Sequence, residues 1–408
     1  MILKREKYLR QIRPFYSSDI IKVITGVRGA GKSALLQSVM DELSAEGICS
    51  DHIIYLNFED PEYACIADAS DLDSEIKSRL HDDRKYFIFL DEIRHVSKFE
   101  KALASLMATL NVSIFVTAGC STLLSGDPAT LLTGRTVEFE LLPFSFSEMR
   151  ELFSQRGWAW PDDNRMFLSY LRWGGLPGRF FCGSDAEAQR YLSNLFMGIV
   201  RRNVTGISGS AGGKDFREIP KRIMAGIAVK NPSVIAAEIS AAPYGVSRRT
   251  VYNYLGRMKN ACLIRSAGRY DIARRSCSLS CYKERLYAAD TGFISANAGN
   301  QDPDYEFLLK NAVFSELISR GFSVFTGKTR SGEVDFAAVR DGRKCLIPVA
   351  YLLDSEESIR REFGAYSRIT DASPRYVVSL DRFDLSHDGI VHLNIIDFLL
   401  GKRDLFLT

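Results

Sequence analysis

The sequence lacks any long apolar run. No stretch of the 408-residue chain approaches the roughly 20 consecutive apolar residues that a membrane-spanning helix needs. The charged first ten residues lack the apolar core of a secretion signal. These two absences argue against an integral membrane protein and against a secreted one, so we expect a cytoplasmic protein without a membrane partner.

Disulfide spacing and an excess of one charge are also missing. The eight cysteines are scattered without the spacing of a disulfide framework, so we expect reduced thiols. The net charge is only +3, so any contact with nucleic acid has to come from local basic patches. With 46% hydrophobic and 25% charged residues, the composition is that of a globular chain of two or three domains.

The most informative segment that is present is Gly-Val-Arg-Gly-Ala-Gly-Lys-Ser, residues 26–33, which fits the phosphate-loop template G-x-x-x-x-G-K-[ST]. An apolar run precedes it and a helix-forming stretch follows it. The glycines let backbone N–H groups surround phosphates, Lys32 can reach the β- and γ-oxygens, and Ser33 can hold Mg²⁺. The predicted nucleotide-binding residues are Gly26, Val27, Arg28, Gly29, Ala30, Gly31, Lys32, Ser33 and Ala34.

A second motif favours ATP hydrolysis over phosphoryl transfer to a metabolite. Five apolar residues, 86–90, indicate a buried strand, and Asp91 and Glu92 follow at its carboxyl end. Asp91 is placed to hold the Mg²⁺ shell, and Glu92 is placed to polarise an attacking water. We therefore predict ATP and Mg²⁺ as cofactors, Ser33 and Asp91 as metal ligands, and Glu92 and Lys32 as catalytic residues.

Four motifs in a fixed order carry a family resemblance. They are the phosphate loop, the strand that ends in Leu-Asp-Glu-Ile at 90–93, Leu-Leu-Pro-Phe-Ser-Phe-Ser-Glu at 141–148 and Trp-Gly-Gly-Leu-Pro at 173–177. Together they resemble the prokaryotic AAA+ ATPases that have an AAA_14-type P-loop domain and a DUF4143-type C-terminal region. The similarity runs over essentially the whole chain, from 5–9 to 396–400. It implies an α/β P-loop NTPase fold of the AAA+ type.

The pattern along the chain predicts four domains. Strand-like runs at 21–25, 53–58, 87–90, 113–117 and 137–141 alternate with helical stretches, which indicates a parallel sheet covered by helices. Helical periodicity between 144 and 204 indicates a lid, and a Gly-, Ser- and Ala-rich stretch at 206–213 indicates a linker. The predicted boundaries are 1–150 for the AAA+ P-loop domain, 151–205 for the helical lid, 206–295 for a winged-helix domain and 296–408 for a nuclease-like domain.

Several residues near the strand ends have two interpretations. Thr117 and Ser121 flank a small-residue turn where the γ-phosphate is expected, so each is either a sensor or part of a turn. Arg135 precedes the last strand, where AAA+ proteins often carry an arginine finger that enters a neighbour's site. It is either that catalytic arginine or part of a surface salt bridge. Asn57 and Glu59 either sense the catalytic water or end a strand.

Two short helices, 233–241 and 247–259, with strands at 263–265 and 285–288, form a helix-turn-helix pattern with a wing. We favour a DNA-binding domain, and the competing interpretation is a docking module for a subunit or another partner. If the domain binds DNA, Thr250, Asn253 and Arg257 would face the groove beside Ser247, with Arg269 on the wing. The candidate nucleic-acid contacts are Arg248, Arg249, Arg274 and Arg275.

The last segment resembles a degenerate PD-(D/E)xK nuclease core. A helix carrying Glu316 precedes a strand carrying Asp335, but the later metal-ligand and lysine positions hold Pro348 and Ala350. Without those ligands a metal and a base cannot surround a phosphate, so we expect no nuclease activity and a structural role for Asp335.

Two functions remain open. One is an AAA+ ATPase that hydrolyses ATP to drive DNA binding, remodelling or translocation as a homo-oligomeric ring such as a hexamer. The alternative is a nucleotide-controlled switch that binds a protein partner in a regulatory or defence system, without motor activity. Function inferred from fold is analogy, so the sequence does not separate them.

Overall fold

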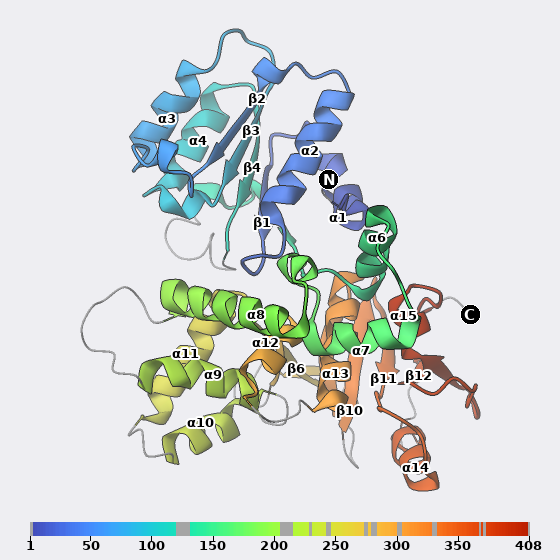
Figure 1. Ribbon diagram of the computed structural model, residues 1–408. Coiled ribbons are helices and arrows are strands. Elements are labelled where there is room, and N and C mark those ends of the chain that lie inside the picture. The colour runs from blue at the N-terminus through green and yellow to red at the C-terminus, as the bar shows by residue number, and fades with distance from the viewer. Residues whose placement is uncertain are drawn as a thin grey trace. The chain divides into compact units, whose positions relative to one another are not determined.

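The computed structural model forms two compact units (Figure 1). Unit 1 comprises Met1–Leu141 with Asn260–Cys262, and unit 2 comprises Leu142–Lys259 with Leu263–Thr408. The structure describes residues 3–119, 131–204, 215–227, 231–241, 246–272, 276–278, 284–299, 304–328, 333–366, 369 and 373–406. Across these ranges, no helix has both the length and the apolar composition needed to cross a membrane.

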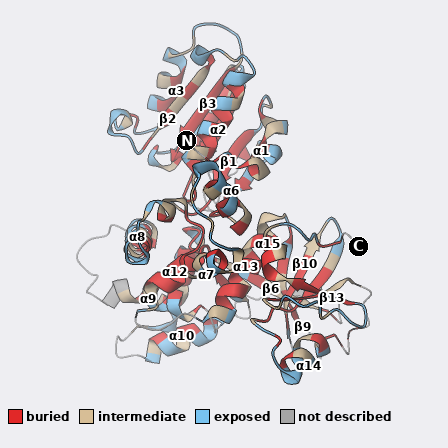
Figure 2. Ribbon diagram, turned by 45° about the vertical axis from the view of Figure 1, so that its right-hand side comes forward, coloured by how far each residue is buried: buried red, intermediate tan, exposed pale blue. Residues whose placement is uncertain are grey.

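Unit 1 is built on a five-stranded parallel sheet with the strand order β2-β3-β4-β1-β5. Its strands are β1 (Ile21–Thr25), β2 (Ile53–Asn57), β3 (Tyr86–Asp91), β4 (Val112–Thr117) and β5 (Thr136–Glu140). Every residue of β1, β3 and β4 is buried (Figure 2), as expected for central strands that helices cover on both faces. The parallel α/β sheet predicted from the sequence is confirmed.

Helices flank this sheet on both sides (Figure 1). They are α1 (Glu6–Ile12), η1 (Arg13–Phe15), α2 (Lys32–Ala45), η2 (Ser50–His52), η3 (Pro61–Tyr63), α3 (Ala69–Ser78), η4 (Ile93–His95) and α4 (Phe99–Thr109). In a parallel sheet the carboxyl ends of the strands share one edge. The ends of β1, β3 and β4 therefore bring the phosphate loop, Asp91–Glu92 and Thr117 together.

Unit 2 begins with helices that lie in the predicted helical stretch 144–204, namely α6 (Phe146–Arg156), α7 (Asp163–Trp173), η5 (Pro177–Phe181), α8 (Asp185–Ile199) and η6 (Val200–Val204). Helix α9 (Asp215–Gly226) follows, and then α10 (Pro232–Ala241) and α11 (Arg248–Asn260) form at the two short helices predicted at 233–241 and 247–259. The remaining helices are α12 (Thr291–Asn297), α13 (Tyr305–Ser319), α14 (Glu356–Gly364) and α15 (Ile395–Leu399).

One eight-stranded sheet runs through unit 2, in the order β13-β12-β11-β10-β9-β6-β7, with β8 paired to β6. Its strands are β6 (Ile264–Asp271), β7 (Ser276–Ser278), β8 (Arg285–Ala288), β9 (Ser323–Lys328), β10 (Glu333–Arg340), β11 (Arg343–Ile347), β12 (Arg375–Ser379) and β13 (Ile390–Asn394). The first half of β6 pairs with β8, and the second half pairs in parallel with β9. A strand expected in the wing thus also belongs to the C-terminal sheet.

The Trp-Gly-Gly-Leu-Pro motif at 173–177 is hydrogen-bonded to a buried carboxylate. Asp290, the N-cap of α12, accepts hydrogen bonds from the backbone N–H groups of Gly175 (2.7 Å) and Gly292 (2.9 Å). A Cβ at Gly174 would lie 1.7 Å from Asp290 Oδ1, and one at Gly175 would lie 1.9 Å from the Phe144 carbonyl oxygen. Only glycine fits either position, so the motif fastens α7 to α12. Burial raises the pKa of Asp290 to about 6.

Candidate nucleotide-binding site

The loop between β1 and α2 has the conformation that its glycines allow. Gly26, Gly29 and Gly31 have φ angles of 140°, 86° and 99°, which L-residues with a Cβ rarely adopt. A Cβ on Gly26 would also lie 2.2 Å from the carbonyl oxygen of Leu141, so the loop has no space for a side chain there. The loop leads directly into α2, whose first residue is Lys32. Its unpaired N–H groups at the helix start form a favourable site for phosphate.

The two predicted catalytic residues, Lys32 and Glu92, are brought together by this arrangement. Lys32 Nζ lies 3.3 Å from Glu92 Oε1 and 3.3 Å from the carbonyl oxygen of Gly26. Both side chains are almost fully buried, at 5% and 9% exposed. Glu92 has φ 53° and ψ 47°, the left-handed region, which costs a residue with a side chain about 1–3 kcal/mol. This turn aims the carboxylate at Lys32 as soon as β3 ends.

Asp91 lies at the carboxyl end of β3 and is 1% exposed. Its Oδ1 accepts a hydrogen bond from the hydroxyl of Thr117, and its Oδ2 accepts one of 3.0 Å from Tyr55. Thr117 also accepts a 2.9 Å bond from the Glu92 N–H, so its buried hydroxyl orients both acids. Ser121, the other sensor candidate, lies outside the described residues.

An Mg²⁺ site fits these residues. The Asp91 carboxylate is fixed by the hydroxyls of Thr117 and Tyr55, while the Ser33 side chain, at the start of α2, is exposed. Hard oxygen donors of this kind suit Mg²⁺, which in phosphate sites takes one or two protein ligands and completes its shell with water and phosphate oxygens. Among the described residues no group of three or more His, Cys, Asp or Glu could hold a metal, and such a group is not what Mg²⁺ beside ATP requires.

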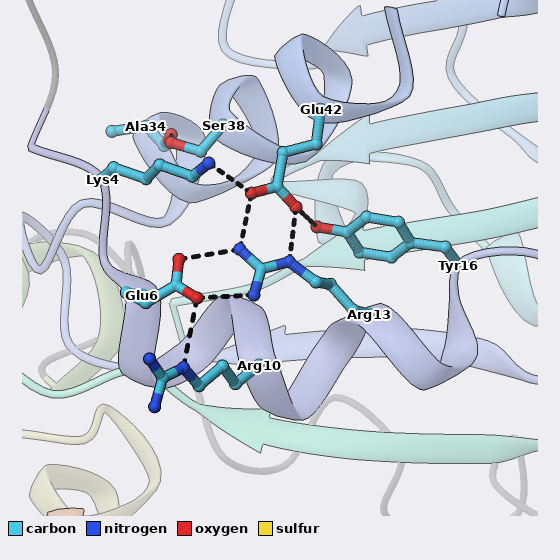
Figure 3. A network of polar contacts seen from close by, with 8 residues as sticks. All are labelled: Lys4, Glu6, Arg10, Arg13, Tyr16, Ala34, Ser38 and Glu42. Atoms are coloured by element: carbon cyan, nitrogen blue, oxygen red, sulfur yellow. Dashed lines mark hydrogen bonds and ion pairs between the residues drawn. The ribbon is translucent and has the colours of Figure 1, made fainter. Parts of the chain in front are cut away.

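The N-terminal segment makes polar contacts with the loop and with helix α2. Arg5 is 4% exposed, stacks on the Tyr8 ring at 4.6 Å and donates a 3.3 Å hydrogen bond to the carbonyl oxygen of Ala30 in the loop. Figure 3 shows a second connection, in which Glu42 on α2 accepts from Arg13 at 2.7 and 2.9 Å and from Tyr16 at 2.8 Å. The Arg13 guanidinium lowers the pKa of Glu42 to about 2, so this contact stays charged near neutral pH.

Arg28 and Glu59 form a bidentate ion pair, with Nη1–Oε1 and Nη2–Oε2 distances of 2.5 and 2.9 Å. The hydrogen bonds that Arg28 donates to the Glu59 carboxylate raise the pKa of Arg28. Asn57 Oδ1 accepts a 3.1 Å bond from the Glu59 N–H, so Asn57 shapes the turn that ends β2. The Arg28–Glu59 pair therefore joins the loop to the turn that ends β2.

Arg135 lies at the opposite edge of the sheet. Its carbonyl oxygen accepts a 2.8 Å hydrogen bond from the Ile21 N–H at the amino end of β1, whereas the loop follows the carboxyl end of that strand. The intervening strand is about 13 Å long at roughly 3.3 Å per residue. The exposed Arg135 side chain is therefore remote from the loop of its own unit.

The predicted nucleic-acid residues are only partly available. Arg248 and Arg249 are exposed at the first turn of α11, and neither has an ion-pair or hydrogen-bond partner among the described side chains. Arg274 and Arg275 lie outside the described residues. Two other candidates are engaged, since Arg257 donates a 2.8 Å bond to the carbonyl oxygen of Val204 and Arg269 pairs with Glu333.

Asp335 has the structural role that the sequence predicts. Its Oδ1 lies 3.0 Å from Lys310 Nζ, and its Oδ2 accepts a 2.9 Å hydrogen bond from the Val349 N–H. Glu316 is occupied in another ion pair, with Arg320 at 2.7 Å. The lysine ammonium thus lies against the carboxylate that a nuclease would use for a metal.

Three residues of the nucleotide site were not found from the sequence. Tyr55 reaches Asp91 because β2 runs alongside β3 with Asn57 opposite Asp91, a register that one sequence does not reveal. Arg5 is a buried arginine, but it lies in a charged segment whose composition is typical of an exposed protein surface. Arg94 has Nε 3.3 Å from Glu92 Oε2, and its only signal was its position two residues after Glu92.

Comparisons with known proteins agree with this geometry. A family model described as an AAA domain matches residues 18–150. The chain is 31% identical to an uncharacterized Haemophilus influenzae protein over 98% of this chain and 99% of that one. It is 29% identical to the uncharacterized Methanocaldococcus jannaschii protein MJ1544 over 90% and 82% of the two lengths. The solved structure of the Walker-type ATPase PABY2304 of Pyrococcus abyssi superposes with a TM-score of 0.50 at 16% identity, covering 72% of this chain and 96% of that one, which shows a shared fold.

Proposed function

The chain belongs to the same family as its 31% identical relative, and its residues 18–150 match an AAA domain; from that premise we propose that it binds ATP with Mg²⁺ and hydrolyses it at the β1–α2 loop. One observation carries the proposal. Lys32, Asp91, Glu92 and Thr117 converge at the carboxyl edge of the sheet, beside a loop whose glycines cannot carry side chains. A phosphate group and a water have partners of the right chemistry at this point.

In the proposed reaction each residue has one task. The loop N–H groups and Lys32 hold the β- and γ-phosphates, and bound Mg²⁺ would neutralise their oxygens. Glu92 orients a water whose oxygen bonds to the γ-phosphorus while the bond from that phosphorus to the bridging oxygen of ADP breaks. The water's proton passes to the Glu92 carboxylate, leaving ADP and phosphate. Thr117 keeps Asp91 and Glu92 in register and is a positioning residue.

The test is nucleotide binding and phosphate release by the purified chain. We expect ATP to bind only weakly without Mg²⁺ and phosphate to be released at a rate that depends on Mg²⁺. Failure of both ATP and ADP to bind at millimolar concentration would overturn the proposal.

We further propose that unit 2 uses this cycle to control binding to DNA, with the predicted domain boundaries 151–205, 206–295 and 296–408 as working limits. Support comes from α11, where two arginines stand at the positive end of the helix dipole, a position that costs a cation about 0.3–1 kcal/mol. Neither has an acidic partner among the described residues, so a phosphate would relieve the cost. Arg257 ties α11 to η6, the continuation of lid helix α8, which gives the lid a connection to this surface.

The DNA proposal predicts a salt-dependent loss on removing the arginines. Replacing Arg248 and Arg249 by Ala should weaken duplex binding. It should also make the slope of log affinity against log salt concentration less steep by about two. The matched control is Arg360→Ala, an exposed arginine paired with Glu356, which should leave the slope unchanged. Arg274→Ala/Arg275→Ala, measured in parallel, tests the second predicted pair.

Two outcomes would change the assignment. Equal slopes for wild type and both double variants would place DNA binding elsewhere on the chain. No binding of wild type to duplex, junction or single strand would favour the partner-switch alternative. Directional strand displacement with DNA-stimulated turnover would support a motor, for which we propose a homo-oligomeric ring.

A further inference from the structure

Arg94 is a second cation at the Glu92 carboxylate, and none of the predicted roles uses it. It lies in η4, directly after the left-handed turn at Glu92, and its side chain is 22% exposed. Its Nε is 3.3 Å from Glu92 Oε2, while Lys32 Nζ is 3.3 Å from Glu92 Oε1. One buried carboxylate therefore bridges two cations, one at the start of α2 and one in η4.

This arrangement is unsuited to catalysis as it stands. Each oxygen of the Glu92 carboxylate faces a cation, Lys32 Nζ at Oε1 and Arg94 Nε at Oε2, so the carboxylate is engaged by both side chains. Glu92 Oε2 is buried and, although it faces Arg94, makes no hydrogen bond with the described residues.

ATP would compete with Glu92 for both cations. The γ-phosphate carries more negative charge than a carboxylate and has three acceptor oxygens. Lys32 is the loop lysine that reaches the β- and γ-oxygens. Guanidinium groups bind phosphate oxygens with charge-assisted hydrogen bonds, often in pairs, so Arg94 has a better partner in the γ-phosphate than in a single carboxylate oxygen.

We propose that Arg94 binds the γ-phosphate in its own chain and exchanges Glu92 for that phosphate when ATP binds. The exchange frees Glu92 to orient the water and supplies positive charge as the γ-phosphoryl group leaves. This inference rests on the proposed function, because it needs ATP in the loop. ADP has no γ-phosphate, so with ADP bound Arg94 stays on Glu92.

Two other arginines of unit 1, Arg28 and Arg135, do not fit this role. Arg28 is held by both oxygens of Glu59, and Arg135 stands at the opposite edge of the sheet. Of these three arginines, Arg94 is the one that contacts the acid on which hydrolysis depends.

The experiment compares wild type with Arg94→Ala and Arg94→Lys, with Arg84→Ala as the matched control because Arg84 is an exposed arginine of unit 1 paired with Asp82. Affinities for ADP and for the analogue AMPPCP are measured with Mg²⁺, together with ATP turnover. Arg94→Ala should keep its affinity for ADP, lose about tenfold or more of its affinity for AMPPCP, and turn over ATP about 100-fold more slowly. The AMPPCP affinity and the ATP turnover of Arg94→Lys should lie between those of wild type and Arg94→Ala.

Mixing separates a residue acting in its own chain from one acting on a neighbour. Arg94→Ala and Lys32→Ala chains both carry defects in their own loop site, so mixing them should restore no activity. Unchanged AMPPCP affinity in Arg94→Ala, or ATP turnover by this variant at the wild-type rate or faster, would overturn the inference about Arg94. The proposed ATPase function would still stand in that case, provided that wild type hydrolyses ATP. A wild type that binds neither ATP nor ADP would overturn the proposed function and this inference together.

Discussion

Glu92→Gln is expected to bind ATP and Mg²⁺ nearly as well as wild type and to hydrolyse ATP about 100-fold more slowly or worse. Loss of a positioned general base removes a factor of about 10²–10⁴ in rate. Glutamine has the size of glutamate and tolerates the same left-handed backbone at φ 53°. Its amide oxygen can still accept from Lys32, so the fold of the turn is preserved, whereas an amide is far too weak a base to take the proton from water.

The measurement pairs nucleotide titration with phosphate release, and the control is Lys32→Ala. Lys32 is buried against both the loop and Glu92, so its removal takes the positive charge from the phosphate site and should weaken ATP binding itself. The two variants then separate turnover from binding. Phosphate release by Glu92→Gln at close to the wild-type rate would remove Glu92 as the group that polarises the water.

The P-loop unit could be predicted from sequence because its signals are local. Each predicted strand of the parallel sheet forms within about one residue of its expected bounds, since short apolar runs between helical stretches have few alternatives. The loop glycines and the Asp91–Glu92 pair mark the nucleotide site directly. Their geometry follows from a general rule, that parallel strands present their carboxyl ends at one edge of the sheet.

The residues that were missed depend on contacts between distant parts of the chain. Tyr55 reaches Asp91 through the register of two strands, and Arg5 reaches Ala30 from the N-terminal segment. The glycine pair at 174–175 suggested a rigid turn, but the buried partner, Asp290, comes more than a hundred residues later. Strand β6 likewise bears no local sign that half of it pairs with β9. Periodicity identifies elements, and it does not say which elements meet.

Arg135 leads to a prediction about assembly. Because it stands at the amino edge of the sheet, about one strand length from the loop, it has no route to the phosphates bound by its own unit. If it acts in catalysis, it acts on a neighbouring chain, and Arg135→Ala should keep ATP affinity while losing about 10³-fold in turnover, the lower range for an arginine finger. If Arg135 belongs only to a surface salt bridge, the same variant should turn over ATP normally.

Complementation decides between these outcomes. In a 1:1 mixture of Arg135→Ala and Lys32→Ala chains, about a quarter of randomly formed interfaces would combine an intact loop from the first chain with an intact Arg135 from the second. Activity should therefore reappear at roughly that fraction of wild type, and only at concentrations where the chains associate. Each variant alone provides the baseline. No recovery at any ratio, although the chains associate, would show that Arg135 completes no neighbour's site.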